Sequence, residues 1–343
     1  MGKKYILTGT LLLLVRLAFA QDPQFTQWYA APLYLNPAFA GSALAPRLTV
    51  NYRNQWPSIT SYVTSSAGFD HFMPGINSGV GFYVLNDNQG QGQIRSTEIA
   101  GQYSYQLRLS EAANLRLGLQ ASYVNRNLNY FGLTFGDQFT NRGYTGNPTS
   151  DPIVLQPSPK NSYVDFTVGG LYYSDWAWIG ATASHINRPA QGFFVGDNTR
   201  LPIKGNIHAG LRIPLLGFTG RGDEMDREIS FSPVILYKFQ GKYDQLDLGA
   251  YLTYSPMTVG VYYRGLPFKR YNQSLNNHDA LAFLIGYRAD KFSIGYSYDA
   301  TVSTLGFASG GSHEISISYT FDPIEKRARR TRQSARQLSC PKF

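Results

Sequence analysis

The chain has 343 residues, of which 15% are aromatic and 15% are charged, and its formal net charge is +9. A typical soluble domain has roughly 25% charged residues, and the mean hydropathy of −0.25 argues against a bundle of apolar helices. The positive charge is concentrated in residues 1–20 and 322–343, so the body is nearly neutral and offers no basic surface for nucleic acid.

Residues 1–20 have the pattern of a secretory signal peptide. Lys3 and Lys4 form a basic start, an apolar core follows, and residues 18–20 form a cleavage site of small-x-small type that leaves Gln21 as the mature N-terminus. The alternative is an anchor helix, but the apolar run is shorter than the ~20 residues that a spanning helix needs. No later apolar run has that length, so any membrane insertion requires β-strands.

Residues 21–46 are rich in Pro, Asn and Ala and are predicted to form a periplasmic N-terminal segment that packs in or under a lumen. An outer-membrane β-barrel of about 14 antiparallel strands is predicted for residues 47–321, because segments near the ~9–11 residues of a tilted spanning strand alternate between apolar and polar positions. The predicted strands are 47–53, 60–72, 78–85, 94–109, 114–129, 163–174, 177–185, 203–214, 228–240, 245–255, 257–266, 281–289, 292–301 and 314–321.

The connections between these strands favour a barrel over a water-soluble β-sandwich, which also alternates. Short turns such as 110–113, 175–176 and 290–291 alternate along the chain with long loops such as 86–93 and 267–280. Short periplasmic turns and long outer loops are typical of outer-membrane barrels. An even strand number places both termini in the periplasm. Tryptophans near strand ends are expected in aromatic girdles at the membrane interface, namely Trp56, Trp176 and Trp178.

A basic tail, residues 322–343, follows the last strand. Its six clustered cations are the candidate partner-binding residues, since arginine pairs with carboxylate or phosphate groups: Lys326, Arg327, Arg329, Arg330, Arg332 and Arg336. The alternative is a disordered appendage. The tail has no aromatic residue within this cluster to stack on bases, so nucleic acid is not expected as a partner.

The sequence contains no pattern for catalysis, so no catalytic, cofactor-binding or metal-binding residues are predicted. Gly-x-Ser-x-Gly and Gly-rich phosphate loops are absent, the five histidines have no metal-ligand spacing, and Cys340 is the only cysteine. A hydrolase whose residues come from different strands stays an open alternative. The acidic residues of 223–228 are either a cation or partner site or a solvated loop, with the loop preferred.

Two stretches near the mature N-terminus read QDPQFTQWY (21–29) and LNPAFAG (35–41), Asn-Gln-Trp follows at 54–56, and the chain closes on CPKF (340–343). In these motifs, and along the mature chain, the sequence resembles the PorP/SprF family of type IX secretion system membrane proteins of Bacteroidetes.

The resemblance implies an outer-membrane barrel without a catalytic role. Its expected partners are the periplasmic ring proteins PorK and PorN, secreted adhesins with C-terminal sorting domains, and outer-membrane lipid. The expected roles are protein export, surface attachment and gliding motility. The rival function is a passive pore for small solutes, which would conduct ions and need no partner.

Overall fold

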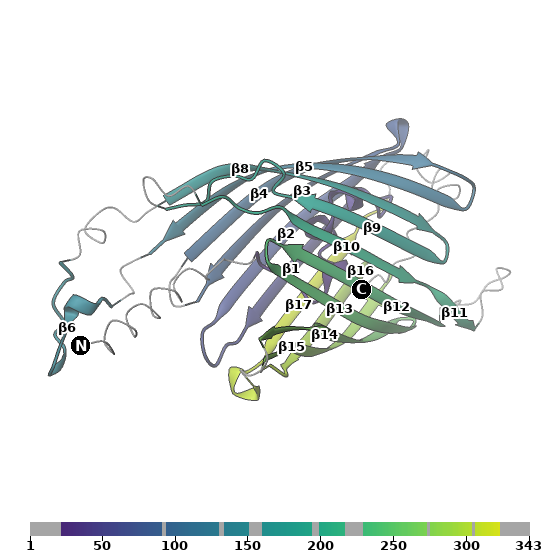
Figure 1. Cartoon of the computed structure of the whole chain (residues 1–343). Coiled ribbons are helices and arrows are strands. Elements are labelled where there is room, and N and C mark those ends of the chain that lie inside the picture. Colours follow the sequence, from purple (N-terminus) through teal and green to yellow (C-terminus); the bar gives the residue numbers. More distant parts are fainter. Residues whose placement is uncertain are drawn as a thin grey trace.

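The computed structural model describes residues 22–90, 94–129, 134–150, 160–193, 199–216, 229–272, 275–303 and 306–322 (Figure 1). The elements in chain order are η2 (Trp28–Ala30), α2 (Pro32–Leu35), η3 (Pro37–Phe39), β1 (Arg47–Gln55), β2 (Tyr62–Met73), η4 (Pro74–Ile76), β3 (Ser78–Gln89), β4 (Ile94–Arg108), β5 (Ala113–Leu128), η6 (Gly136–Gln138), β6 (Phe139–Thr140), β7 (Gly143–Tyr144), β8 (Lys160–Ser174), β9 (Ala177–Ser184), β10 (Lys204–Leu211), β11 (Ile213–Leu216), β12 (Ile229–Gln240), β13 (Tyr243–Tyr254), β14 (Met257–Asn272), β15 (Leu275–Ala289), β16 (Phe292–Thr301), η7 (Phe307–Ser309) and β17 (Ser312–Thr320). None of the helices in the described ranges is long and apolar enough to cross a membrane.

The large sheet closes on itself. Neighbouring strands pair antiparallel around the ring, β1 pairs with β17, and β10 pairs with β12. β11 continues β10 after Arg212 and pairs with the start of β12, while β6 and β7 form a separate two-stranded hairpin. Counted in this way the ring has 14 strands, which confirms the predicted fold.

Alternation along each strand separates an outer from an inner face. On β1, Leu48, Val50 and Tyr52 are 42–45% exposed, whereas Thr49 and Asn51 are almost completely buried. β17 repeats the pattern, with Ile315, Ile317 and Tyr319 on the exposed face. Apolar residues outward and polar residues inward are what a barrel in lipid requires, because the wall satisfies its own backbone hydrogen bonds.

The barrel has two rims. One carries the short connections 74–77, 109–112, 175–176, 255–256 and 290–291, together with the longer connection 217–228, and is called the short-turn rim below. The opposite, long-loop rim carries long connections such as 56–61, 129–159, 185–203 and 302–311, and also the short connections 241–242 and 273–274.

Two of the predicted loops are shorter in the structure than the sequence suggests. The segment 86–93 is strand as far as Gln89, and within 267–280 β14 runs to Asn272 and β15 begins at Leu275. Polar side chains suggested loops at these places, but strand pairing uses backbone groups and tolerates polar residues above the lipid zone.

Candidate functional site: a plugged lumen

Residues 22–46 lie inside the barrel and are called the plug below. Figure 1 shows their short helices within the ring of strands. Asn36 begins η3 by accepting a hydrogen bond from the Ala38 amide at 2.9 Å, and Pro37 follows at the first helical position. Ala38, Phe39 and Ala40 are buried. The Asn-Pro-Ala motif at 36–38 therefore makes a tight turn that fits within the lumen.

The plug is anchored to the wall near the long-loop rim by a carboxylate. The Glu314 side chain of β17 accepts hydrogen bonds from the backbone amides of Thr26 at 2.7 Å and Gln27 at 2.9 Å. The Thr26 hydroxyl donates to Asp299 of β16 at 2.7 Å. These bonds satisfy plug backbone groups that would otherwise be buried without partners.

The anchoring carboxylates belong to a buried network of charged side chains. Arg53 of β1 pairs with Asp299 and Glu314, and Arg264 of β14 pairs with Asp299 and Asp247. Lys238 of β12 lies 3.3 Å from Asp247 of β13 and completes the network. Its three cations balance its three carboxylates, which is the condition under which buried charges are tolerated.

A second anchor holds the plug near the short-turn rim. Arg116 of β5, which is completely buried, donates to the carbonyl oxygens of Ala38 and Ala40. Asp70 of β2 accepts from the Gly41 amide at 2.8 Å and pairs with Arg47 at 2.9 Å. The plug is therefore bound to the wall at two places, one towards each rim.

Wall glycines let the plug backbone approach. A Cβ atom at Gly79 would lie 2.0 Å from the Ala40 carbonyl oxygen, and one at Gly118 would lie 2.3 Å from the Ala38 nitrogen. At both positions a side chain would collide with plug backbone, which cannot rotate away.

Trp178 is a plug contact and not a girdle residue, so that prediction was wrong. It is 2% exposed, and its indole nitrogen donates to the Tyr29 hydroxyl at 2.6 Å. Tyr29 stacks on Trp28 with ring centroids 4.4 Å apart. The parity of β9 decides this, because the neighbouring Ile179 is exposed on the outer face. Trp176 is 64% exposed on a short turn.

The first described residue, Asp22, lies on the long-loop side of the lumen. Its carboxylate is 2.9 Å from His185 Nε2 and 3.0 Å from Lys204 Nζ. Asp165 contacts the other ring nitrogen of His185 at 3.0 Å. Burial alone would lower the pKa of His185, but the two carboxylates outweigh it and raise that pKa to about 9.

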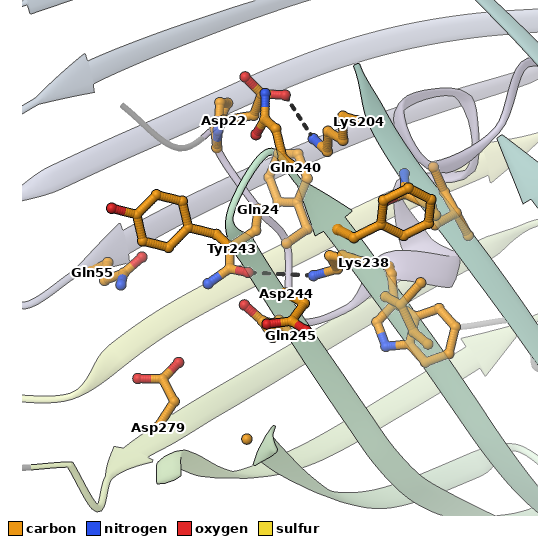
Figure 2. Close-up of a pocket in the computed structure, with 18 of the residues that line it drawn as sticks. Asp22, Gln24, Gln55, Lys204, Lys238, Gln240, Tyr243, Asp244, Gln245 and Asp279 are labelled. Carbon is orange, nitrogen blue, oxygen red and sulfur yellow. Dashed lines mark hydrogen bonds and ion pairs between the residues drawn. The ribbon is translucent and has the colours of Figure 1, made fainter. Parts of the chain in front are cut away.

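A pocket of about 400 Å³ opens between the plug and the long-loop rim. The plug residues Phe25, Trp28 and Leu35 form its apolar side, together with Leu236 of the wall. Figure 2 shows the polar side, where Lys204 and Lys238 pair with neighbours and the Asp279 carboxylate is directed into the pocket.

The residues predicted as partner-binding lie outside the described residues: Lys326, Arg327, Arg329, Arg330, Arg332 and Arg336. The acidic stretch 223–228, the predicted signal peptide at 1–20 and Cys340 also lie outside them. The last described residue, Asp322, is at the short-turn rim, where the preceding Phe321 amide donates to the Pro46 carbonyl. Within the described ranges, no group of three or more His, Cys, Asp or Glu residues could hold a metal ion.

Sequence reasoning missed the lumen network. A signal was available, because a chain with few charges places Arg53, Asp247, Arg264, Asp299 and Glu314 within predicted strands or at their ends. Charged residues in membrane strands must face the interior. This pattern predicts that the charged side chains face the lumen, but it does not predict which of them pair with one another.

The fold defines a class, that of β-barrels of the outer-membrane type, here with a lumen occupied by the chain's own N-terminal segment. The sequence matches the family described as "Type IX secretion system membrane protein PorP/SprF" over residues 17–319, and the chain belongs to that family.

Known structures with similar architecture are outer-membrane barrels. Omp33 of Acinetobacter baumannii has 7% identity and a TM-score of 0.40, covering 82% of this chain and 100% of that one. CdiB of the same species has 8% identity and a TM-score of 0.42, covering 81% and 60%. A Pseudomonas aeruginosa FadL homologue has 12% identity and a TM-score of 0.42, covering 83% and 93%. A search of the curated proteins gives no match.

Proposed function

We propose that this protein is an outer-membrane component of the type IX secretion system that works by binding other proteins. The observation that carries the proposal is the plug. A lumen filled by a segment bound to the wall at two places suits a scaffold better than a channel for free diffusion. Membership of the PorP/SprF family supports the assignment to the type IX secretion system. The proposed roles within that system are export or surface attachment of adhesins and gliding motility.

The orientation follows the usual pattern of such barrels, with short turns in the periplasm. Asp322 then lies at the periplasmic side, and the basic tail that follows is placed to bind periplasmic ring proteins such as PorK and PorN. Secreted proteins with C-terminal sorting domains are the other proposed partners. A periplasmic location of the N-terminal end stays a prediction; the first described residue, Asp22, contacts Lys204 at the long-loop side of the lumen.

The proposal is tested by deleting the gene and comparing the released and cell-surface proteomes with wild type. Loss of many exported proteins would assign the barrel to the core machine, and loss of one large adhesin would assign it to that adhesin. Unchanged proteomes would overturn the proposal and favour the passive pore.

Complementation tests the tail. A chain that ends at Asp322 and a full-length chain with the six tail cations changed to Gln should both fail to restore export, since each lacks the charge proposed to bind partners. Full-length wild type is the control. If the variant with the six Gln substitutions restores export, the tail does not bind its partners through these charges.

A further inference from the structure

The pocket at the long-loop rim contains polar atoms without partners. The side chains of Asn206, Gln240 and Asn277 line it, and each has one buried atom with no hydrogen bond within the described part of the chain. Asn206 is 7% exposed and offers a carbonyl oxygen, whereas Gln240 and Asn277 offer amide nitrogens. Unsatisfied buried polar atoms are costly, and three of them at one pocket leave two donors and one acceptor available to a ligand.

A β-bulge turns a carboxylate into this pocket. Arg264 pairs with Ala280 and Gly265 with His278, which leaves Asp279 as the extra residue of β15. Without the bulge, alternation would send Asp279 outward, because Leu281 and Phe283 lie on the outer face. Bulges of this kind commonly re-aim side chains at functional sites. Figure 2 shows the carboxylate facing the open space.

The cations that the structure describes around Asp279 are already paired with other carboxylates. Lys204 is paired with Asp22 and Lys238 with Asp247, so both lysines of the pocket are already engaged. Arg264, which attracts Asp279 electrostatically, is paired with Asp247 and Asp299. The Asp279 backbone carbonyl accepts from the amides of Val302 and Ser303, but its carboxylate has no hydrogen bond or ion pair among the described residues. The other two carboxylates of the lining, Asp22 and Asp244, already have partners in Lys204 and the Tyr237 hydroxyl. The pocket therefore offers a ligand the Asp279 carboxylate, two amide donors and one acceptor beside an apolar side.

We propose that this pocket binds a short extended peptide segment carrying a lysine or arginine, which enters from the long-loop rim. The cationic side chain pairs with Asp279, the amides of Gln240 and Asn277 donate to peptide carbonyls, and Asn206 accepts from a peptide amide. The volume of about 400 Å³ lies in the roughly 300–1,000 Å³ range of ligand pockets. A sugar ligand is disfavoured because it would need a free aromatic ring to stack on. Phe25 and Trp28, on the apolar side of the pocket, already pack against Tyr34 and Tyr29.

The test uses the purified full-length protein in detergent and isothermal titration with blocked tripeptides. Acetyl-Leu-Lys-Leu-amide is expected to bind at least about tenfold tighter than acetyl-Leu-Glu-Leu-amide, since only the lysine peptide can form a charge-assisted hydrogen bond with Asp279. Asp279→Asn should abolish that preference. Asp290→Asn, a matched change in a short turn on the opposite rim, should leave it intact.

Equal binding of the two peptides, or an unchanged preference in Asp279→Asn, would overturn the inference. So would binding of maltotriose with no binding of either peptide. If Asp279→Asn does not fold, the lysine-against-glutamate contrast on wild type still decides the question. The inference goes beyond the secretion role and does not need it. An unchanged exported proteome together with lysine-selective binding would leave this site standing while removing the proposed function.

Discussion

Glu314 bonds the plug more directly than any other network carboxylate. It accepts from two consecutive plug amides and from Arg53. Glu314→Gln should lower the free energy of unfolding by about 3 kcal/mol, because removing one charge leaves Arg53 with a reduced set of buried partners. Urea unfolding in detergent measures the change. Glu111→Gln, in an exposed turn, is the control and should have almost no effect.

The same residue permits a test of coupling. If the Arg53–Glu314 pair is the cause, the double variant Arg53→Met with Glu314→Leu should lose less stability than the two single losses combined. Strict additivity would show that the two residues act independently.

The wall glycines give a second prediction at the level of single atoms. Gly118→Ala should destabilise the protein by about 1–3 kcal/mol, because the new methyl group would press on the backbone of Ala38. Gly101→Ala is the matched control on the adjacent strand, where an added Cβ meets nothing within 4 Å. Thermal unfolding, followed by heat-modifiable migration on gels, compares the two. Equal melting temperatures would contradict the close fit of plug and wall.

At the level of elements, the start of the plug is held by a titratable group. The folded pKa of His185 is about 9, above its ordinary value of 6.5, so its stabilisation is complete below pH 6.5 and disappears as pH rises through 9. Between pH 6 and pH 10, wild type should lose roughly 3 kcal/mol of stability from this group.

His185→Gln isolates that contribution. The variant should be less stable than wild type at pH 6 and should lack this part of the decline towards pH 10, when both are unfolded in urea at each pH. Parallel pH curves for the two proteins would show that the Asp22–His185–Asp165 contact does not stabilise the fold.

At the level of the whole molecule, the plug should determine conductance. Wild type in planar bilayers should show little ion current, whereas a variant lacking residues 22–35 should conduct steadily, because most of those residues are buried inside the barrel and several line its pocket. Heat-modifiable migration must first show that the variant is folded. A steady large current through wild type would support the passive pore.

Family membership and the barrel could be predicted from sequence because both depend on local features, namely short motifs and side-chain alternation within each segment. Strand existence follows from alternation within each segment, as in 47–53 and 314–321, and every predicted strand overlaps an observed one. Strand ends were less predictable. Polar residues at 86–88 were assigned to a loop, although backbone pairing continues through them.

The candidate site could not be read in the same way, because its residues come together only through closure of the ring. Thr26, Glu314 and Arg53 are far apart in sequence, and Asp279 enters the lumen only because a bulge shifts the register of β15. By itself, the sequence determined the class, the strand number and the face of each strand, since side-chain alternation is local. The tertiary structure alone decided that the lumen is plugged, that Trp178 contacts Tyr29 of the plug, and that the Asp279 carboxylate has no partner among the described residues, since these depend on which strands closure makes neighbours.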